Sequence, residues 1–184
     1  MPHNASLIPP TIASNANLFA HITDINHHSP ILTVKINIMK DLKLGIACDH
    51  AGFALKQTVI AWLKEQGVQV TDYGCPSTDS CDYPDFAHQL AVTVEAGECY
   101  PGIAICGSGE GISMTLNKHQ GIRAALVWIP EIAKMTRLHN DANVLVMPGR
   151  YIDTETASQI MDEFFNTEFE GGRHQKRIDK IPVK

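Results

Sequence analysis

The sequence contains no long apolar run, no C-x-x-C pair and no arginine before Arg123. A membrane-spanning helix needs about 20 consecutive apolar residues, and no stretch approaches that length, so no membrane partner is expected. The five cysteines are odd in number and no secretory leader is visible, which indicates a reducing, cytoplasmic environment. The formal net charge of -5 does not favour nucleic acid as a partner.

The first forty residues differ in composition from the rest of the chain. They contain no glycine and no arginine, but four prolines and many Asn and Ser residues. The lack of arginine argues against a transit peptide. We expect residues 1–40 to form a loose extension, with a short strand at 31–38 and Met39 as an alternative start. Its histidines have no closely spaced cysteine or acidic ligands, so no metal site is expected there.

From residue 41 onward, short apolar strands alternate with amphipathic helices, as expected for a single domain. The predicted strands cover 44–48, 68–73, 103–106, 122–128 and 144–147, and the predicted helices cover 51–66, 86–96, 112–118, 130–139 and 154–166. Such alternation is typical of a parallel sheet. We therefore predict an α/β fold: a three-layer open sheet of about five parallel strands with helices on both faces, similar to the Rossmann arrangement.

Polar residues follow three of the predicted strands. Asp49-His50 follow the first strand, the loop Cys106–Gly111 follows the third, and Arg150 follows the fifth. Ligands bind such sheets at the carboxyl ends of the strands. We expect His139-Asn140, at the end of a predicted helix, to lie on this same edge. The plain structural alternatives are a helix cap for Asp49 and a polar turn after His139.

The loop Cys106–Gly111 is rich in glycine and lies between a predicted strand and a predicted helix. Free backbone amides at such a position bind anions and stabilise a thiolate. The loop lacks the Lys-[Ser/Thr] ending of a Walker loop and the full G-x-G-x-x-G register. The amides of Gly107, Gly109 and Gly111, with the Ser108 hydroxyl, suit an oxyanion better than a pyrophosphate. Packing of Cys106 as a small apolar side chain remains the alternative.

The late arginines are candidates for binding an anionic substrate. Arg173 and Arg177 lie four residues apart, on one face if that segment is helical. Together with Arg150 and a glycine loop they indicate a phosphate group. For any single arginine, a solvated surface position is the alternative.

Several motifs occur in order along the chain. They are Cys48–Phe53, Asp82–Asp85, Cys106–Gly109, Asn117–Lys118, Gly121–Ala124, His139–Asn143 and Gly171–Arg177. Together they resemble the ribose-5-phosphate isomerase B family, within the ribose/galactose isomerase group. The resemblance runs from about Leu42 to the end of the chain and omits the N-terminal extension.

The resemblance implies an aldose–ketose isomerase that interconverts ribose 5-phosphate and ribulose 5-phosphate in the pentose phosphate pathway. The reaction would pass through an enediolate, without a metal or an organic cofactor. The alternatives are an isomerase of allose 6-phosphate or galactose 6-phosphate, and a phosphosugar-binding regulator that has lost catalysis. The resemblance also implies a homodimer or homotetramer in which the C-terminal tail reaches a neighbouring subunit.

The resemblance further assigns roles to individual residues. Cys106 would be the base, the loop amides and Ser108 would hold the enediolate oxygens, and His139 with Asp49 would open the sugar ring. The positions that match substrate contacts are His50, Tyr83, Gly107, Gly109, Glu110, Gly111, Asn140, Arg150, Arg173 and Arg177.

Glu110 departs from the family pattern, because its position is often neutral in relatives. Members without the cysteine use a glutamate two positions further on, where this chain has Ile112. We therefore expect Cys106 to be the base. Glu110 then either faces solvent or acts on the thiol by charge repulsion.

Overall fold

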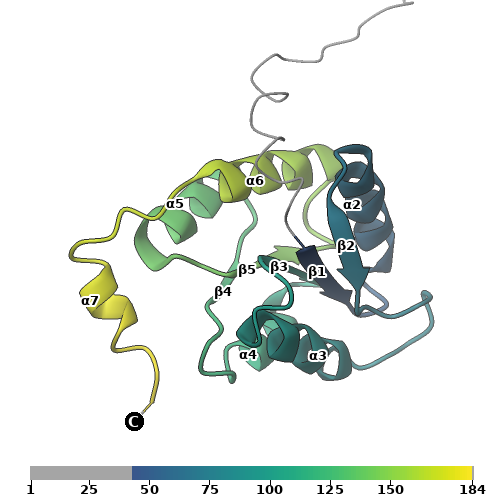
Figure 1. Ribbon diagram of the computed structural model, residues 1–184. Helices are drawn as coiled ribbons and strands as arrows, with labels where there is room; N and C mark the ends of the chain where they lie inside the picture. Colours follow the sequence, from purple (N-terminus) through teal and green to yellow (C-terminus); the bar gives the residue numbers. More distant parts are fainter. Residues whose placement is uncertain (1–42, 184) are drawn as a thin grey trace, which may run out of the picture.

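The computed structural model describes residues 43–183, so the extension predicted at 1–40, with its strand at 31–38, lies outside the described residues. The described chain forms one parallel sheet of five strands in the order β2-β1-β3-β5-β4 (Figure 1). The strands are β1 Lys43–Cys48, β2 Gln69–Asp72, β3 Gly102–Cys106, β4 Ala124–Leu126 and β5 Val144–Pro148. The predicted parallel α/β fold is confirmed.

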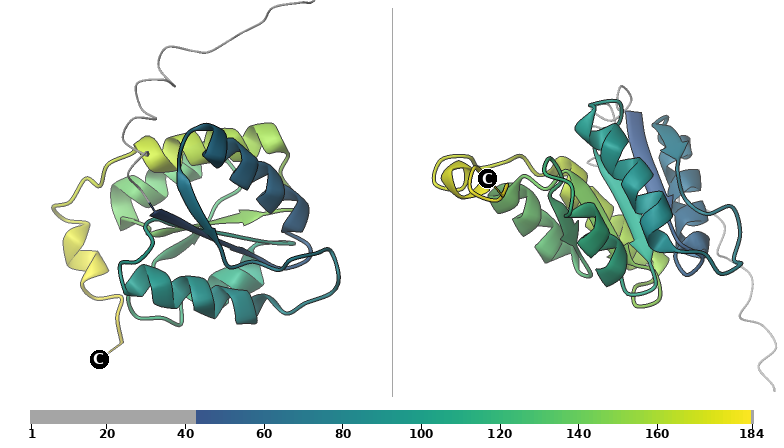
Figure 2. Two further views of the ribbon diagram at one scale, coloured as in Figure 1. Left: turned by 45° about the vertical axis from the view of Figure 1, so that its right-hand side comes forward. Right: turned by 90° about the horizontal axis from the view of Figure 1, so that it is seen from below.

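Helices cover both faces of the sheet, as predicted. They are α2 Phe53–Glu65, α3 Tyr83–Glu95, α4 Glu110–Leu116, α5 Pro130–Asn140, α6 Thr154–Asn166 and the short α7 Gln175–Ile178. Helices α2, α5 and α6 pack on one face, and α3 and α4 pack on the other (Figure 2). Within residues 43–183, no helix combines the length and the apolar character that crossing a bilayer requires.

The alternation of side chains along β3 explains this three-layer arrangement. Ile103 and Ile105 point into the core under α2 and α6, whereas Ala104 and Cys106 point into the core under α3 and α4. Successive side chains of a strand face opposite sides of a sheet, so a strand buried on both faces is apolar throughout. This alternation places the Cys106 thiol on the face of the sheet that α3 and α4 cover.

Most predicted bounds lie within two residues of the observed ones, and the start of α3, which differs by three residues, is the largest exception. Helix α3 begins at Tyr83 rather than 86, because Pro84 fits the first turn of a helix. Strand β4 is shorter than the predicted 122–128. The Asn117 side-chain amide donates to the Ala124 carbonyl and its oxygen accepts from the Ala124 N–H, both at 2.9 Å, so a side chain binds the outer edge of this strand.

The strand order reverses between β1 and β3, which brings their carboxyl ends together. From β1 the chain passes to β2 on one side and then back to β3 on the other. The Asp49 N–H donates to the Ile105 carbonyl at 3.3 Å, and a Cβ on Gly52 would collide with that same carbonyl. In open α/β sheets, ligands bind at such a reversal.

Candidate active site

Five of the predicted site segments meet at the reversal. We call them the strand-end cluster: Asp49, His50, Tyr83, the loop Cys106–Gly111 and Arg150. Cys106 is the last residue of β3 and only 4% of it is exposed. Its carbonyl accepts from the Gly149 N–H at 2.9 Å, and the Gly107 carbonyl accepts from the Arg150 N–H at 3.1 Å. Backbone hydrogen bonds therefore hold the turn after β5 against the cysteine loop.

At two positions of the loop, close packing leaves no room for a side chain, so that only glycine fits. Gly109 has φ +79°, a left-handed conformation that favours glycine, and a Cβ there would collide with the Leu126 side chain. A Cβ on Gly111 would lie 2.5 Å from the Tyr83 ring. The aromatic ring of Tyr83 thus lies directly against the loop, as its place in the predicted site requires.

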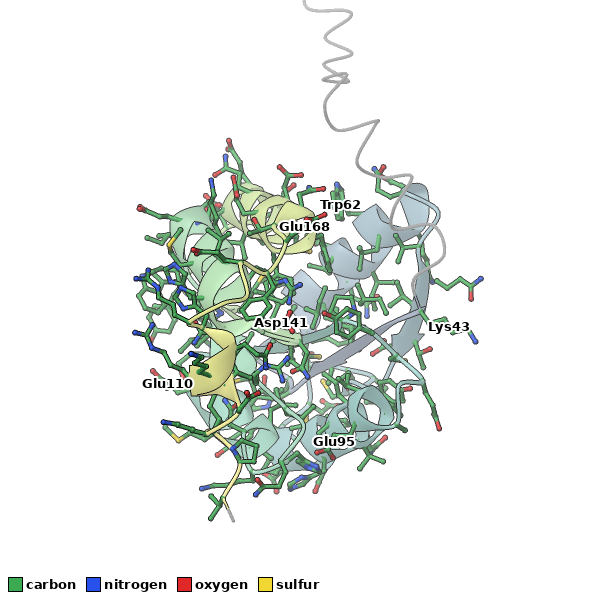
Figure 3. The ribbon with its side chains drawn as sticks, turned by 60° about the vertical axis from the view of Figure 1, so that its left-hand side comes forward. Lys43, Trp62, Glu95, Glu110, Asp141 and Glu168 are labelled. Atoms are coloured by element: carbon green, nitrogen blue, oxygen red, sulfur yellow. The ribbon has the colours of Figure 1, made fainter. Side chains whose placement is uncertain are left out.

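Ser108 and Glu110 lie at the outer side of this loop. The Ser108 hydroxyl oxygen accepts from the Glu110 N–H at 3.4 Å, at the start of α4. The Glu110 side chain is exposed (Figure 3), which favours the solvent-facing alternative over an action on the buried thiol.

Asp49 and His50 occupy the turn after β1. Asp49 is 6% exposed, and its Oδ1 accepts from the Gly52 N–H at 3.0 Å. Because Gly52 is itself the N-cap of α2, Asp49 stabilises the preceding turn rather than capping the helix. His50 Nδ1 lies 3.3 Å from both the N–H and the carbonyl of Cys81. The imidazole is anchored through Nδ1, which leaves Nε2 to contact a ligand.

The two cysteines that flank this turn are poor candidates for the reactive thiol. Burial raises the pKa of Cys48, and the neighbouring Cys75 thiol acts in the same direction against the opposing effect of Lys56. Burial also raises the pKa of Cys81, with Cys75 adding to the effect. Raised thiol pKa values keep both groups protonated at neutral pH.

Two exposed aromatic side chains beside the loop, Trp128 and Tyr151, were not predicted from the sequence. Ser108 and Glu110 line a hollow together with Leu126, Trp128, Pro148 and Tyr151. Trp128 is 51% exposed and Tyr151 is 76% exposed. Both follow strands at their carboxyl ends, which is the signal that could have identified them.

His139 and Asn140 lie at the edge of the sheet formed by the amino ends of the strands, which we call the amino edge. Cys106 lies at the opposite edge, formed by the carboxyl ends, so the expectation that His139 and Asn140 share its edge is wrong. Helix α5 starts after the carboxyl end of β4 and returns the chain to the amino end of β5, and these residues form its last turn. The Asn140 carbonyl accepts from Arg123 Nε at 3.0 Å, and Arg123 directly precedes β4. A helix that connects parallel strands must end at the amino edge.

Residues of the C-terminal tail pack beside His139. The Glu170 N–H donates to the Leu138 carbonyl at 3.1 Å, which fixes the tail to α5. The His139 and His174 rings stack with centroids 4.4 Å apart and planes inclined by 7°. Glu170 Oε2 lies 4.0 Å from His139 Nε2 and 3.6 Å from His174 Nε2. We call these three residues the histidine cluster.

Burial holds the pKa of His174 below its usual value. The neighbouring His139 acts in the same direction, and Glu170 opposes both. A lowered pKa favours the neutral imidazole at neutral pH. Sequence reasoning assigned no role to Glu170 or His174, although their spacing of four residues matches one helical turn.

The three arginines predicted to bind phosphate are divided between the two edges. Arg150 follows β5 beside the cysteine loop. Arg173 and Arg177 are exposed and belong to the tail near the histidine cluster, where Arg173 Nε lies 3.3 Å from His174 Nε2. One chain therefore does not gather all three around a single phosphate.

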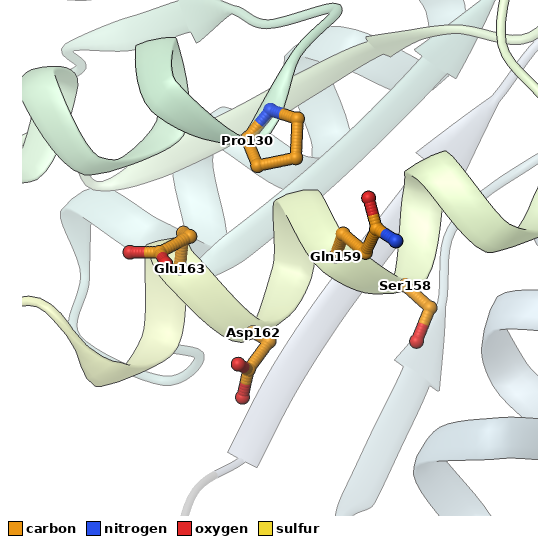
Figure 4. Close-up of a pocket in the computed structure, with 5 residues that line it drawn as sticks. All are labelled: Pro130, Ser158, Gln159, Asp162 and Glu163. Carbon is orange, nitrogen blue, oxygen red and sulfur yellow. The ribbon is translucent and has the colours of Figure 1, made fainter.

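A further hollow lies between the start of α5 and the outer surface of α6 (Figure 4). It is lined by Pro130, Ser158, Gln159, Asp162 and Glu163. Two carboxylates without a basic side chain among these lining residues do not suit a phosphorylated ligand. The hollow is no candidate for the predicted substrate.

Comparison with known proteins identifies relatives over nearly all of the described chain. The family model for ribose/galactose isomerase matches residues 44–181. Ribose-5-phosphate isomerase B of Escherichia coli strain K12 is 45% identical over 139 residues, which are 76% of this chain and 93% of that protein. A probable ribose-5-phosphate isomerase B of Mycoplasma pneumoniae is 47% identical over 137 residues, 74% of this chain and 90% of that protein.

Solved structures resemble the chain equally well. The Thermotoga maritima ribose 5-phosphate isomerase matches with a TM-score of 0.76 and 46% identity, over 77% of this chain and 98% of that one. The Mycoplasma genitalium ribose-5-phosphate isomerase B, solved with bound ribulose-5-phosphate, matches with a TM-score of 0.73 and 41% identity, over 77% of this chain and 94% of that one.

Proposed function

This chain belongs to the ribose/galactose isomerase family, and from that premise we propose that it interconverts ribose 5-phosphate and ribulose 5-phosphate. The observation that carries the proposal is the strand-end cluster, in which a cysteine, a carboxylate and an imidazole follow two adjacent strands. The sugar phosphate is the ligand for which these groups are suited. The free thiols of Cys48, Cys75, Cys81, Cys99 and Cys106 agree with work in a reducing cytoplasm.

In the proposed reaction, the Cys106 thiolate removes the proton from C2 of the open-chain aldose and returns it at C1, while the hydroxyl proton on O2 is transferred to O1. The electrons of the broken C–H bond pass into an enediolate, whose oxygens accept hydrogen bonds from the amides of Gly107 to Gly111 and from Ser108. A positioned base typically contributes about 10²–10⁴ in rate, and oxyanion donors contribute a similar factor. No step of this proton transfer calls for a metal or an organic cofactor.

We propose that the complete site forms between two copies of the chain. Ring opening is assigned to His139 with Asp49, yet these residues lie at opposite edges of one sheet. They serve one sugar only if His139, Asn140 and the tail arginines of one copy approach the strand-end cluster of another. Arg150 and His50 would then bind the phosphate from one copy, and Arg173 and Arg177 from the other.

The exposed apolar side chains beside the loop support this assembly. Met114, Trp128, Ile129 and Tyr151 are all at least 41% exposed. Trp128 and Tyr151 line one hollow beside the loop, Ile129 directly follows Trp128, and Met114 lies on α4. Neighbouring large apolar groups at a surface mark an interaction site. A homodimer formed over this patch, alone or as half of a tetramer, would cover them and bring a second copy next to Cys106.

Purified protein given ribose 5-phosphate should form ribulose 5-phosphate, as followed by ketose absorbance. Allose 6-phosphate and galactose 6-phosphate are the matched substrates, because they carry one more carbon. Faster turnover of either would identify a six-carbon isomerase. Binding of ribose 5-phosphate without turnover of any of the three would identify the phosphosugar-binding regulator instead.

A further inference from the structure

We infer that the histidine cluster is a binding site for a divalent transition-metal ion, with Zn²⁺ as the best fit. His139 Nε2, His174 Nε2 and Glu170 Oε2 all lie within 4.8 Å of one another. Two imidazole nitrogens and a carboxylate oxygen are a donor set that zinc accepts with a fourth position left open. Among residues 43–183, this is the one place where three such side chains bring ligand atoms together.

Holding the ion requires Glu170 to move closer and the His139 ring to turn out of its stack with His174, because lone pairs in nearly parallel ring planes do not converge on one ion. Ligands at about 2.0–2.1 Å from a tetrahedral zinc are separated from one another by about 3.3 Å. Glu170 Oε2 already lies 3.6 Å from one imidazole nitrogen and 4.0 Å from the other. Rotation of the exposed Glu170 side chain and of the partly exposed His139 ring, which is 40% exposed, can close the remaining gap.

The scaffold around the donors is held in place before any ion arrives. Glu170 is tied to α5 by its backbone N–H, and the His174 N–H donates to the Gly171 carbonyl at 3.1 Å. Hard cations such as Mg²⁺ prefer oxygen ligands and do not suit this set.

The positively charged side chain of Arg173 opposes metal binding at the histidine cluster. Arg173 Nε lies 3.3 Å from His174 Nε2, where its positive charge competes for the same lone pair. Arg173 is exposed and can swing away into solvent. Loss of its charge should therefore strengthen metal binding, an effect that a purely structural histidine stack would not show.

Metal at this site would also inhibit the enzyme. This consequence rests on the proposed function, because it assumes that His139 opens the sugar ring. An ion bound at His139 Nε2 occupies the nitrogen that would carry the proton. Zinc would then block turnover by occupying the ring-opening group, and substrate bound at the strand-end cluster of the neighbouring copy would compete with it.

The test measures metal binding directly, on the full chain without an affinity tag and without substrate. Zn²⁺ affinity is measured by calorimetry, and Co²⁺ is used as a spectroscopic probe of the ligands. We expect Glu170→Gln to weaken Zn²⁺ binding by about tenfold or more, because even supporting residues of metal sites contribute that much. Arg173→Gln should strengthen binding. The Co²⁺ spectrum should lack the charge-transfer band of thiolate ligands.

Two matched variants control the assignment. Glu168→Gln makes the same change two residues earlier, at an exposed position on the same segment (Figure 3). His88→Gln removes a histidine from the pair with His119, whose nitrogens face each other at 2.8 Å instead of converging with a carboxylate on one point. Both should bind Zn²⁺ within twofold of the unsubstituted protein.

The proposal is overturned if Glu170→Gln binds Zn²⁺ as tightly as the unsubstituted chain, or if the Co²⁺ spectrum shows thiolate ligands. It is also overturned if the protein binds no Zn²⁺. The isomerase assay is read separately: zinc binding that depends on Glu170 without any turnover would sustain the metal site and refute the proposed function. Turnover that zinc binding leaves unchanged would refute only the inhibition.

Discussion

The two polar regions of this chain are built by different means. The strand-end cluster depends on backbone geometry: adjacent strand ends, a left-handed glycine and amide-to-carbonyl bonds between turns. The histidine cluster depends on side chains from the end of α5 and from the tail, which stack and approach through their ring nitrogens. The first lies at the carboxyl edge of the sheet and the second at the amino edge. This separation is why one chain alone holds only part of the proposed site.

The largest expected effect concerns the proposed base in the strand-end cluster. Cys106→Ala should lower turnover by about 10²–10⁴ and leave ribose 5-phosphate binding within a few fold, since the thiol acts mainly on the transferred proton. Steady-state kinetics and calorimetry would measure the two quantities. Cys99→Ala is the matched control, because Cys99 is also buried, at 3% exposure, but precedes the amino end of β3.

Mixed assemblies would show whether the two regions of different copies cooperate. Co-expression of a Cys106→Ala chain with a His139→Gln chain should restore about a quarter of the normal activity. Half of randomly formed dimers are mixed, and each of those has one intact site of its two. Neither variant should be active alone. An absence of restored activity in a verified mixed dimer would show that each site is built from one copy.

Two glycines of similar conformation can test whether the strand-end cluster depends on the backbone geometry of its loop. Gly109 and Gly97 have φ of +79° and +70°, but only at Gly109 would a Cβ meet neighbouring atoms. Alanine at Gly97 should lower the free energy of unfolding by about 1 kcal/mol. Alanine at Gly109 should lower it by a further 1–3 kcal/mol or so and reduce turnover, because the loop must move away from Leu126.

Chemical denaturation with parallel activity assays would separate the two glycine variants. Similar losses in both would show that strain alone matters, and that the contact between the loop and Leu126 carries no weight. Full activity in Gly109→Ala would contradict the view that loop geometry sets the proposed oxyanion site.

The smallest expected effect concerns a side-chain contact at the amino edge. Glu95 accepts from the Gly121 N–H at 2.8 Å and lies 3.0 Å from His119 Nδ1. The Gly121 amide and then His119 hold the pKa of Glu95 below its usual value of 4.5. The contribution of this lowered pKa to stability is therefore present above pH 4.5 and is lost as the pH falls through the lowered value.

Glu95→Gln should remove that pH dependence and lower the free energy of unfolding by about 1 kcal/mol at neutral pH. Thermal unfolding at several pH values would measure it. Turnover should stay near normal, because Glu95 belongs to neither polar region. A large loss of turnover would mean that the contact of Glu95 with Gly121 and His119 helps to position the residues of the proposed site.

The common position of Asp49, His50 and the Cys106 loop could be predicted from the sequence because it follows from local rules. An apolar strand, a following glycine loop and Asp49-His50 after β1 reach one edge in any parallel sheet. The expected placement of His139 was wrong because α5 runs from the carboxyl end of β4 to the amino end of β5, which puts the end of the helix at the amino edge. The start of β4 was also missed, because the N–H of Arg123, directly before the strand, donates to the Asn143 side chain at 2.8 Å, a contact that the apolar pattern does not reveal.

The sequence by itself determined the fold class, the family and the edge at which Cys106 lies, because periodicity and strand-to-loop succession are local properties of the chain. The placement of His139 at the other edge also follows from the order of strand, helix and strand, because a helix between two parallel strands ends at the amino edge. Only the tertiary structure decided that the tail returns to α5, so that Glu170 and His174 meet His139. Those contacts arise from the path of the tail, which no local pattern encodes.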